Sequence, residues 1–208
     1  MKKYKIIFLL YLLFGSQFIF SAVPDKDECY NKLKDKYWHI KTISFKFSSP
    51  DTKYLSGSLI AARGNKYFIS TKSNDIYSNG KTVWNHYISN KKVLISDFVD
   101  DKMNMLSIEG FFFNFLDYYY PESLTESVSS LGNKSYVLEL SAKVESNVKI
   151  KSFKIWFNPD DYVIKSIKLN TNNMVQTLNI DDLKLDKKIP DKVFEYKPTG
   201  KEEIIDYR

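Results

Sequence analysis

The chain is short of the residues that most catalytic and metal sites require. Cysteine occurs once, at Cys29, and histidine twice, at His39 and His86. A single cysteine excludes an internal disulfide, and the absence of a His-x-x-x-His pair removes a common zinc signature. The seven glycines are scattered, so no glycine-rich loop is present to cradle a phosphate. These shortages argue against metal, nucleotide and Cys/His nucleophile chemistry, and we expect no cofactor and no metal.

Positive charge is also modest. The whole chain has a formal net charge of +6, and its first 22 residues contribute Lys2, Lys3 and Lys5 but no acid, so the remainder has a net charge of +3. Lysines and arginines are spread along that remainder and do not form the clustered patch that follows a phosphate backbone. We therefore expect no nucleic-acid partner.

The first 22 residues have the layout of an export signal. A basic start precedes the apolar stretch 6–13, and the small residues Ser21 and Ala22 offer a cleavage site. Phe20 occupies the position three residues before that cut, where cleavage sites prefer a small residue. The alternative is that the segment stays uncleaved as a membrane anchor. We expect export to the periplasm of a Gram-negative bacterium, with residues 23–208 forming one domain of monomeric protein.

Beyond an expected helix over 26–40, the apolar residues alternate with a period of two, which is typical of strands with one buried face. Asn79-Gly80 indicates a tight hairpin. Short turns between successive strands predict an antiparallel meander, and an open meander of this length must roll up to bury its apolar face. The fold class is therefore mainly β (α+β). Strands are expected over 43–47, 55–61, 67–71, 82–89, 93–98, 135–141, 148–157, 162–169 and 174–185.

An aromatic stretch over 106–120 interrupts this pattern, with phenylalanine at 111, 112, 113 and 115. The stretch is too short to cross a bilayer, which takes about 20 apolar residues. A helix built from it is apolar on nearly every side, so it must be buried on two faces or cover an apolar space. A covering segment over 101–120 favours a cavity, although the pattern alone also allows an interior filled by side chains.

Two other features have both a functional and a purely structural interpretation. Counting by twos from Leu59 places Arg63 on the apolar face at a strand end, where it is either an exposed turn residue or an arginine at a cavity mouth. Asp160-Asp161 and Asp181-Asp182 can be imagined as acid/base pairs. The first pair follows Asn158-Pro159 and suits turn chemistry, and the second lies in a strand pattern.

Four stretches resemble, in order, the periplasmic outer-membrane lipoprotein carriers, the LolA-like proteins. Three departures from the family pattern are Gly64 in place of proline, Asn79 in place of aspartate and Tyr196 in place of phenylalanine. They leave room for a diverged carrier with a different cargo. The stretches are 57–68 (GSLIAARGNKYF), 77–87 (YSNGKTVWNHY), 103–116 and 189–206 (IPDKVFEYKPTGKEEIID).

This resemblance implies an unclosed antiparallel β-barrel (a half-barrel) whose helices form a lid over a hydrophobic cavity for acyl chains. It implies that Arg63 is the lid latch, and that the partners are acylated lipoproteins or lipids, an inner-membrane lipoprotein-releasing ABC transporter and an outer-membrane receptor. It implies no enzymatic activity. The cavity and lid residues we expect are Phe45, Phe47, Leu59, Tyr67, Ile69, Trp84, Met103, Leu106, Phe111, Phe112, Phe115, Leu116 and Trp156.

Three alternatives remain open at this point. The first is a lipid-binding or lipoprotein-sensing protein of the same fold with different cargo. The second is a secreted lipid hydrolase with Asp160 or Asp181 as its base, although the chain has no Gly-x-Ser-x-Gly elbow. The third treats the aromatic stretch as an adhesive or oligomer interface.

Overall fold

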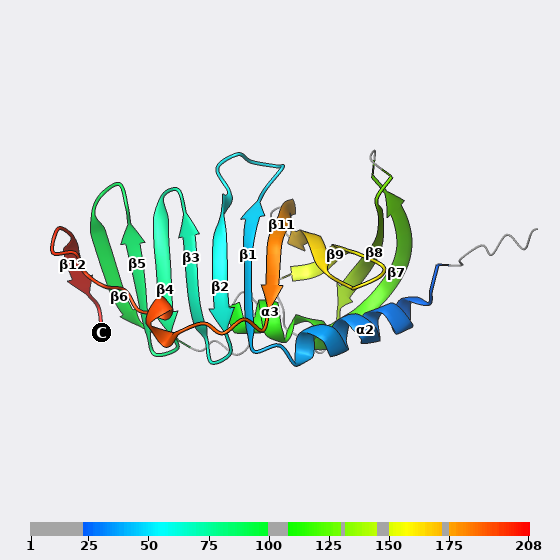
Figure 1. Ribbon diagram of the computed structural model, residues 1–208, viewed down its shortest axis with the longest axis horizontal. Helices are drawn as coiled ribbons and strands as arrows, with labels where there is room; N and C mark the ends of the chain where they lie inside the picture. Colours follow the sequence, from blue (N-terminus) through cyan, green and yellow to red (C-terminus); the bar gives the residue numbers. More distant parts are fainter. Residues whose placement is uncertain (1–22, 100–107, 130–131, 145–149, 172–174) are drawn as a thin grey trace, which may run out of the picture.

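The computed structural model describes residues 23–99, 108–129, 132–144, 150–171 and 175–208. The expected signal over 1–22 lies outside these residues. In the described part of the chain, a twelve-stranded sheet dominates, and two α-helices lie against it (Figure 1). None of the described helices is both long and apolar enough to span a bilayer.

The sheet is antiparallel except at one end. Its order is β12-β6-β5-β4-β3-β2-β1-β11-β10-β9-β8-β7, so β1 pairs with β11 across most of the sequence, and β12 pairs with β6 in parallel. The strands are β1 (Thr42–Ser48), β2 (Ser56–Ala62), β3 (Lys66–Thr71), β4 (Asn74–Asn79), β5 (Thr82–Tyr87), β6 (Lys92–Asp97), β7 (Tyr119–Val128), β8 (Lys134–Ala142), β9 (Ile150–Phe157), β10 (Ile164–Thr171), β11 (Val175–Leu185) and β12 (Glu203–Asp206).

The sheet bends but does not close. From β12 to β1 the strands run side by side as a broad wall, and from β11 to β7 the sheet turns sharply (Figure 1). Among the described residues, β12 and β7 stand at opposite ends of the strand order and do not pair with each other. The predicted unclosed antiparallel half-barrel is confirmed.

Strand register divides the sheet into two faces. Side chains that lie opposite each other on paired strands share a face. Phe45, Leu59 and Ile69 are successive partners on what we call the inner face. Phe68 and Tyr77 are partners on the opposite, outer face.

Helix α2 (Lys26–Trp38) covers part of the inner face, as the apolar spacing in its sequence predicts. The carboxylate of Asp25 caps it by accepting hydrogen bonds from two amides of its first turn. Its buried side chains are Cys29, Leu33 and Tyr37. The Tyr30 hydroxyl donates to the carbonyl oxygens of Leu116 at 2.5 Å and Tyr119 at 3.0 Å, which ties α2 to the end of the aromatic stretch.

The aromatic stretch forms two short helices and then continues into a strand. Helix α3 (Ile108–Phe113) and the 3-10 helix η1 (Phe115–Tyr118) lie on the same side of the sheet as α2. The ring of Phe112 lies 5.2 Å from that of Phe45 on the inner face. Strand β7, which follows directly, was not expected from the sequence.

The C-terminal segment covers the outer face instead. It crosses in front of β1 to β4, forms the 3-10 helix η2 (Asp191–Phe194) and ends in β12 (Figure 1). Phe194 is fully buried there, and the ring of Tyr196 packs on Tyr77 at 5.6 Å and on His86 at 5.4 Å. Burial raises the pKa of Tyr196 to about 12. The sequence predicts a polar tail after Tyr196, and the structure shows that this tail returns to the sheet as β12.

Candidate functional site

An apolar groove opens on the inner face beside α3. Its volume is about 270 Å³, close to the lower end of the range for small-molecule pockets, about 300 to 1,000 Å³. The groove offers a ligand no charged or hydrogen-bonding side chain, so it suits a hydrocarbon surface. We call it the outer groove, and its lining residues are Phe45, Phe47, Leu55, Leu59, Ile69, Ile108, Phe112, Leu169 and Leu178.

A second apolar space lies deeper, between α2, α3 and the curved part of the sheet. Its volume is about 20 Å³, barely room for one water molecule. We call it the inner pocket, and its lining residues include Tyr37, Ile43, Phe115 and Phe153. Phe45 and Phe112 line both the inner pocket and the outer groove. The Phe45–Phe112 pair therefore forms the partition between the two spaces.

Arg63 stands where the turn after β2 meets the helices. Its Nε donates to the carbonyl oxygen of Ile40 at 2.8 Å, and one of its terminal nitrogens donates to the carbonyl oxygen of Trp38 at the end of α2. The guanidinium carbon lies 5.1 Å from the Phe113 ring centroid. Carbonyl groups at a helix C-terminus have no partner within the helix and attract a cation. Arg63 thus joins β2 to both α2 and α3.

The same turn binds a carboxylate from α3. The backbone amides of Gly64 and Asn65 donate to Oε2 of Glu109 at 3.0 and 3.2 Å. The other oxygen of Glu109, Oε1, lies 3.7 Å from the guanidinium of Arg63. Glu109 was missed from the sequence because two of these three contacts use backbone amides, which leave no side-chain pattern.

The structure places most of the predicted cavity residues on the inner face. Phe45, Phe47, Leu59, Ile69 and Phe112 line the outer groove. Tyr67 packs at the edge of the inner core, whereas Phe115 and Leu116 are buried within it. Met103 and Leu106 lie outside the described residues, and of Phe111 only the backbone, within α3, is described.

The two predicted tryptophans lie on the wrong face. Trp84 is the strand partner of Tyr77 and Ile95, and therefore lies on the outer face. Trp156 alternates with Ile155 and Phe157, which are fully buried on the inner face, so its own side chain points outward. The expectation that Trp84 and Trp156 line the cavity is wrong. For Trp156, the alternation of its buried neighbours was a signal in the sequence.

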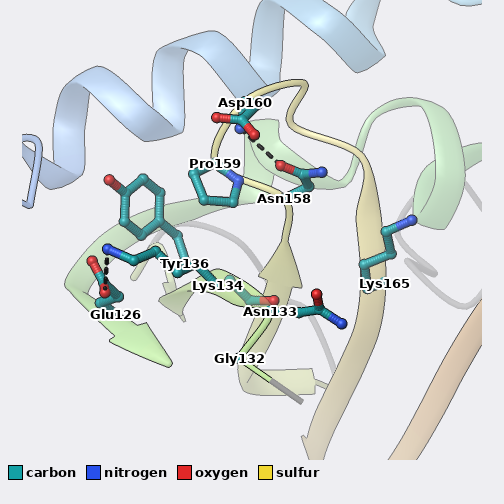
Figure 2. A pocket seen from close by; sticks show the side chains of 10 residues that line it. Glu126, Gly132, Asn133, Lys134, Tyr136, Asn158, Pro159, Asp160 and Lys165 are labelled. Carbon is teal, nitrogen blue, oxygen red and sulfur yellow. Dashed lines mark hydrogen bonds and ion pairs between the residues drawn. The ribbon is translucent and has the colours of Figure 1, made fainter. Parts of the chain in front are cut away.

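A larger concavity of about 660 Å³ is polar (Figure 2). It lies between the end of the β7–β8 hairpin and the β9–β10 turn. Lys134 and Glu126 form an ion pair at 3.1 Å on one wall, and the Asp160 amide donates to Oδ1 of Asn158 at 2.8 Å on the other. This asparagine–amide contact is the turn chemistry that the sequence predicts for Asn158 to Asp161.

The groups required for hydrolysis are not brought together in the described part of the chain. Asp181 lies on β11 opposite Lys46, and His86 packs on Tyr196 at the outer face. Burial raises the pKa of the Cys29 thiol and so disfavours its nucleophilic thiolate form. No cluster of three or more metal-ligating side chains occurs among the described residues.

The fold and groove define a class: an open antiparallel half-barrel with an apolar groove beside a lid helix. No family model matches the chain, and no curated protein matches its sequence. Among solved structures, it is similar to an uncharacterized conserved protein from Thermus thermophilus. The two share 12% sequence identity with a TM-score of 0.54, over 88% of this chain and 99% of that one.

Two further solved structures align over most of the chain at lower TM-scores. The LolA superfamily protein NE2245 from Nitrosomonas europaea has 14% identity and a TM-score of 0.39, over 84% of this chain and 99% of that one. LprF from Mycobacterium bovis has 6% identity and a TM-score of 0.48, over 81% of this chain and 96% of that one. At such identities the likeness concerns the fold alone.

Proposed function

We propose that this protein is a periplasmic carrier that binds the acyl chains of lipoproteins in the outer groove and shuttles them from the inner to the outer membrane. By the resemblance described above, it receives cargo from an inner-membrane lipoprotein-releasing ABC transporter and delivers it to an outer-membrane receptor. It acts as a monomer and performs no chemistry. The observation that supports this proposal is the outer groove, an apolar space beside helix α3, which contacts the β2–β3 turn through Phe113 on Arg63 and through Glu109.

The groove volume limits what the closed form holds. A methylene group occupies about the volume of a water molecule, roughly 30 Å³, so about nine methylenes fit in 270 Å³. Shielding nine methylenes from water is worth about 7 kcal/mol at 0.8 kcal/mol each. That capacity is less than one long acyl chain, so a cargo with several chains requires α3 to move away from the sheet.

The same volume favours a second candidate function. A protein of this fold that binds one acyl chain, as a lipid-binding or lipoprotein-sensing protein, needs less space than a carrier of triacylated lipoproteins. Gly64, Asn79 and Tyr196, which depart from the LolA-like pattern, are consistent with a different cargo. The two functions differ in the number of chains bound per protein.

Native mass spectrometry of residues 23–208, purified gently from a bacterial periplasm, tests the proposal. Lipoprotein bound one-to-one, and released by competing lipid, supports the carrier. A bound single-chain lipid supports the second candidate. A protein that is free of lipid and also fails to bind a fluorescent fatty-acyl probe contradicts both. Turnover of a lipid ester by the purified protein contradicts the absence of chemistry.

A further inference from the structure

We propose that Glu109 is the lid-side half of the latch, and that its release from the β2–β3 turn lets α3 withdraw so that the outer groove and inner pocket become one acyl-binding space. This inference rests on the proposed function. It adds a residue that positions the lid, and it states what opening the lid does to the cavity.

Helix α3 presents its groove-lining and latch residues at matching intervals. Ile108 and Phe112 are four residues apart and both line the outer groove. Glu109 and Phe113 are likewise four residues apart and both contact the Arg63 turn. Residues at this spacing lie on one face of a helix. Because the two faces are adjacent on one short helix, a movement that detaches Glu109 also moves Phe112.

The turn that holds Glu109 is rigidly braced. The Ser78 hydroxyl donates to the carbonyl oxygen of Asn65 at 2.8 Å and accepts from the amide of Gly80 at 3.2 Å. A Cβ atom at Gly80 would meet the carbonyl oxygen of Gly64 at 2.2 Å, so only glycine allows the two turns to approach this closely. The amides of Gly64 and Asn65 are therefore fixed in place before Glu109 binds.

Residue 64 is itself part of the site. Gly64 has a φ of +85°, which a proline cannot adopt, and its amide donates to Glu109. A proline at this position, as in the LolA-like pattern, has no amide hydrogen to donate. One of the two amide contacts to the carboxylate thus depends on the glycine that distinguishes this chain from the family that it resembles.

When α3 withdraws, the Phe112 ring leaves Phe45, and the partition between the outer groove and the inner pocket is lost. Phe45 and Phe112 line both spaces, and their rings are 5.2 Å apart. With α3 in place, the inner pocket of about 20 Å³ cannot admit an acyl chain. With Phe112 displaced, the groove extends toward Phe115 and Phe153, so one event enlarges the space and exposes aromatic surface.

The test uses residues 23–208, a fluorescent fatty-acyl probe and amide hydrogen exchange measured residue by residue by NMR. Glu109→Ala removes both amide contacts and the contact with Arg63, whereas Glu109→Gln keeps one acceptor oxygen. Glu126→Ala is the matched control, because Glu126 forms an ion pair with Lys134 at 3.1 Å away from the groove. Circular dichroism establishes that each variant is folded.

We expect Glu109→Ala to take up the probe about 10-fold faster than the wild type, Glu109→Gln to be intermediate, and Glu126→Ala to match the wild type. In the wild type, we expect the probe to accelerate exchange of the Gly64 and Asn65 amides. The inference is overturned if the bound probe leaves the exchange of these two amides unchanged, or if Glu109→Ala takes up the probe at the wild-type rate.

Failure of the proposed function gives a different result. If the wild type binds no probe, the acyl-binding function is wrong, and the contact of Glu109 with the β2–β3 turn is then tested without ligand. Glu109→Ala must then still accelerate exchange at Gly64 and Asn65 and leave the Ser129 amide, which is bonded at 2.9 Å to the Asn133 carbonyl, unchanged. Unaltered exchange at Gly64 and Asn65 would show that Glu109 does not hold this turn.

Discussion

Phe112 and Phe115 lie three residues apart, and truncating each to alanine should rank the two variants in one order for stability and in the reverse order for ligand binding. Phe115 is 5% exposed and packs on the Phe153 ring at 5.8 Å, so Phe115→Ala should cost about 3–5 kcal/mol of folding stability. Phe112 is half-buried in the groove wall. About half that loss, roughly 1.5–2.5 kcal/mol, is expected for Phe112→Ala, because its exposed part already meets solvent.

Ligand binding should rank the two variants in the reverse order. The Phe112 ring faces the outer groove, and loss of its contact with about two methylenes, at about 0.8 kcal/mol each, should weaken binding of an acyl probe roughly 10-fold. Phe115→Ala should weaken probe binding less than Phe112→Ala wherever it remains folded, because Phe115 joins the acyl-binding space only once Phe112 is displaced. Urea unfolding and probe titration at one temperature measure both quantities. Equal destabilisation of the two variants, together with wild-type affinity for Phe112→Ala, would show that the groove wall is static core.

Three other perturbations follow from the site. Arg63→Leu should leave the sheet folded but bind acyl probe roughly 5- to 30-fold more tightly and release it more slowly. The reason is that the closed form loses the contacts of the guanidinium with Glu109 and Phe113 on α3, which together are worth about 1–2 kcal/mol. Stopped-flow release kinetics measure this, and wild-type kinetics would contradict the latch. Burial raises the pKa of Tyr37 and Tyr196 to about 12 from about 10 in the unfolded chain. Their contribution to stability is therefore complete below pH 10 and is lost as the pH rises from 10 through 12, so urea midpoints should fall over that interval, and a flat profile would contradict it. Gly80→Ala should destabilise the protein by about 1–3 kcal/mol, because its φ is +86° and its Cβ would meet Gly64; thermal unfolding unchanged from the wild type would refute the close approach.

The local patterns in the sequence predict much of this fold. Tyr30, Leu33 and Tyr37 recur at helical spacing and produce α2, and Asn79-Gly80 produces the β4–β5 hairpin. Alternation of Phe45 and Phe47 with polar neighbours predicts which side of β1 is buried. These features depend on contacts between residues near each other in the chain, so short windows of sequence contain the information.

The site is only partly visible in those patterns. Arg63 could be placed at a strand end on the apolar face, and Phe112 in a covering segment. Trp84 was assigned to the wrong face because β5 has apolar residues on both sides, so alternation does not say which side is inner. Glu109 could not be found, since its partners are the backbone amides of a distant turn.

The sequence by itself therefore determined most of the strands, though not β4, β7 and β12, together with many turns, the first helix and the apolar character of a covering segment. Only the tertiary structure decided that β1 pairs with β11 and that β12 joins β6 in parallel. It alone showed that the β2–β3 turn holds Glu109 beside a groove divided by Phe45 and Phe112. The physical reason is that these arrangements join residues far apart in the chain, and such pairings are selected by the packing of the whole sheet and not by any local preference.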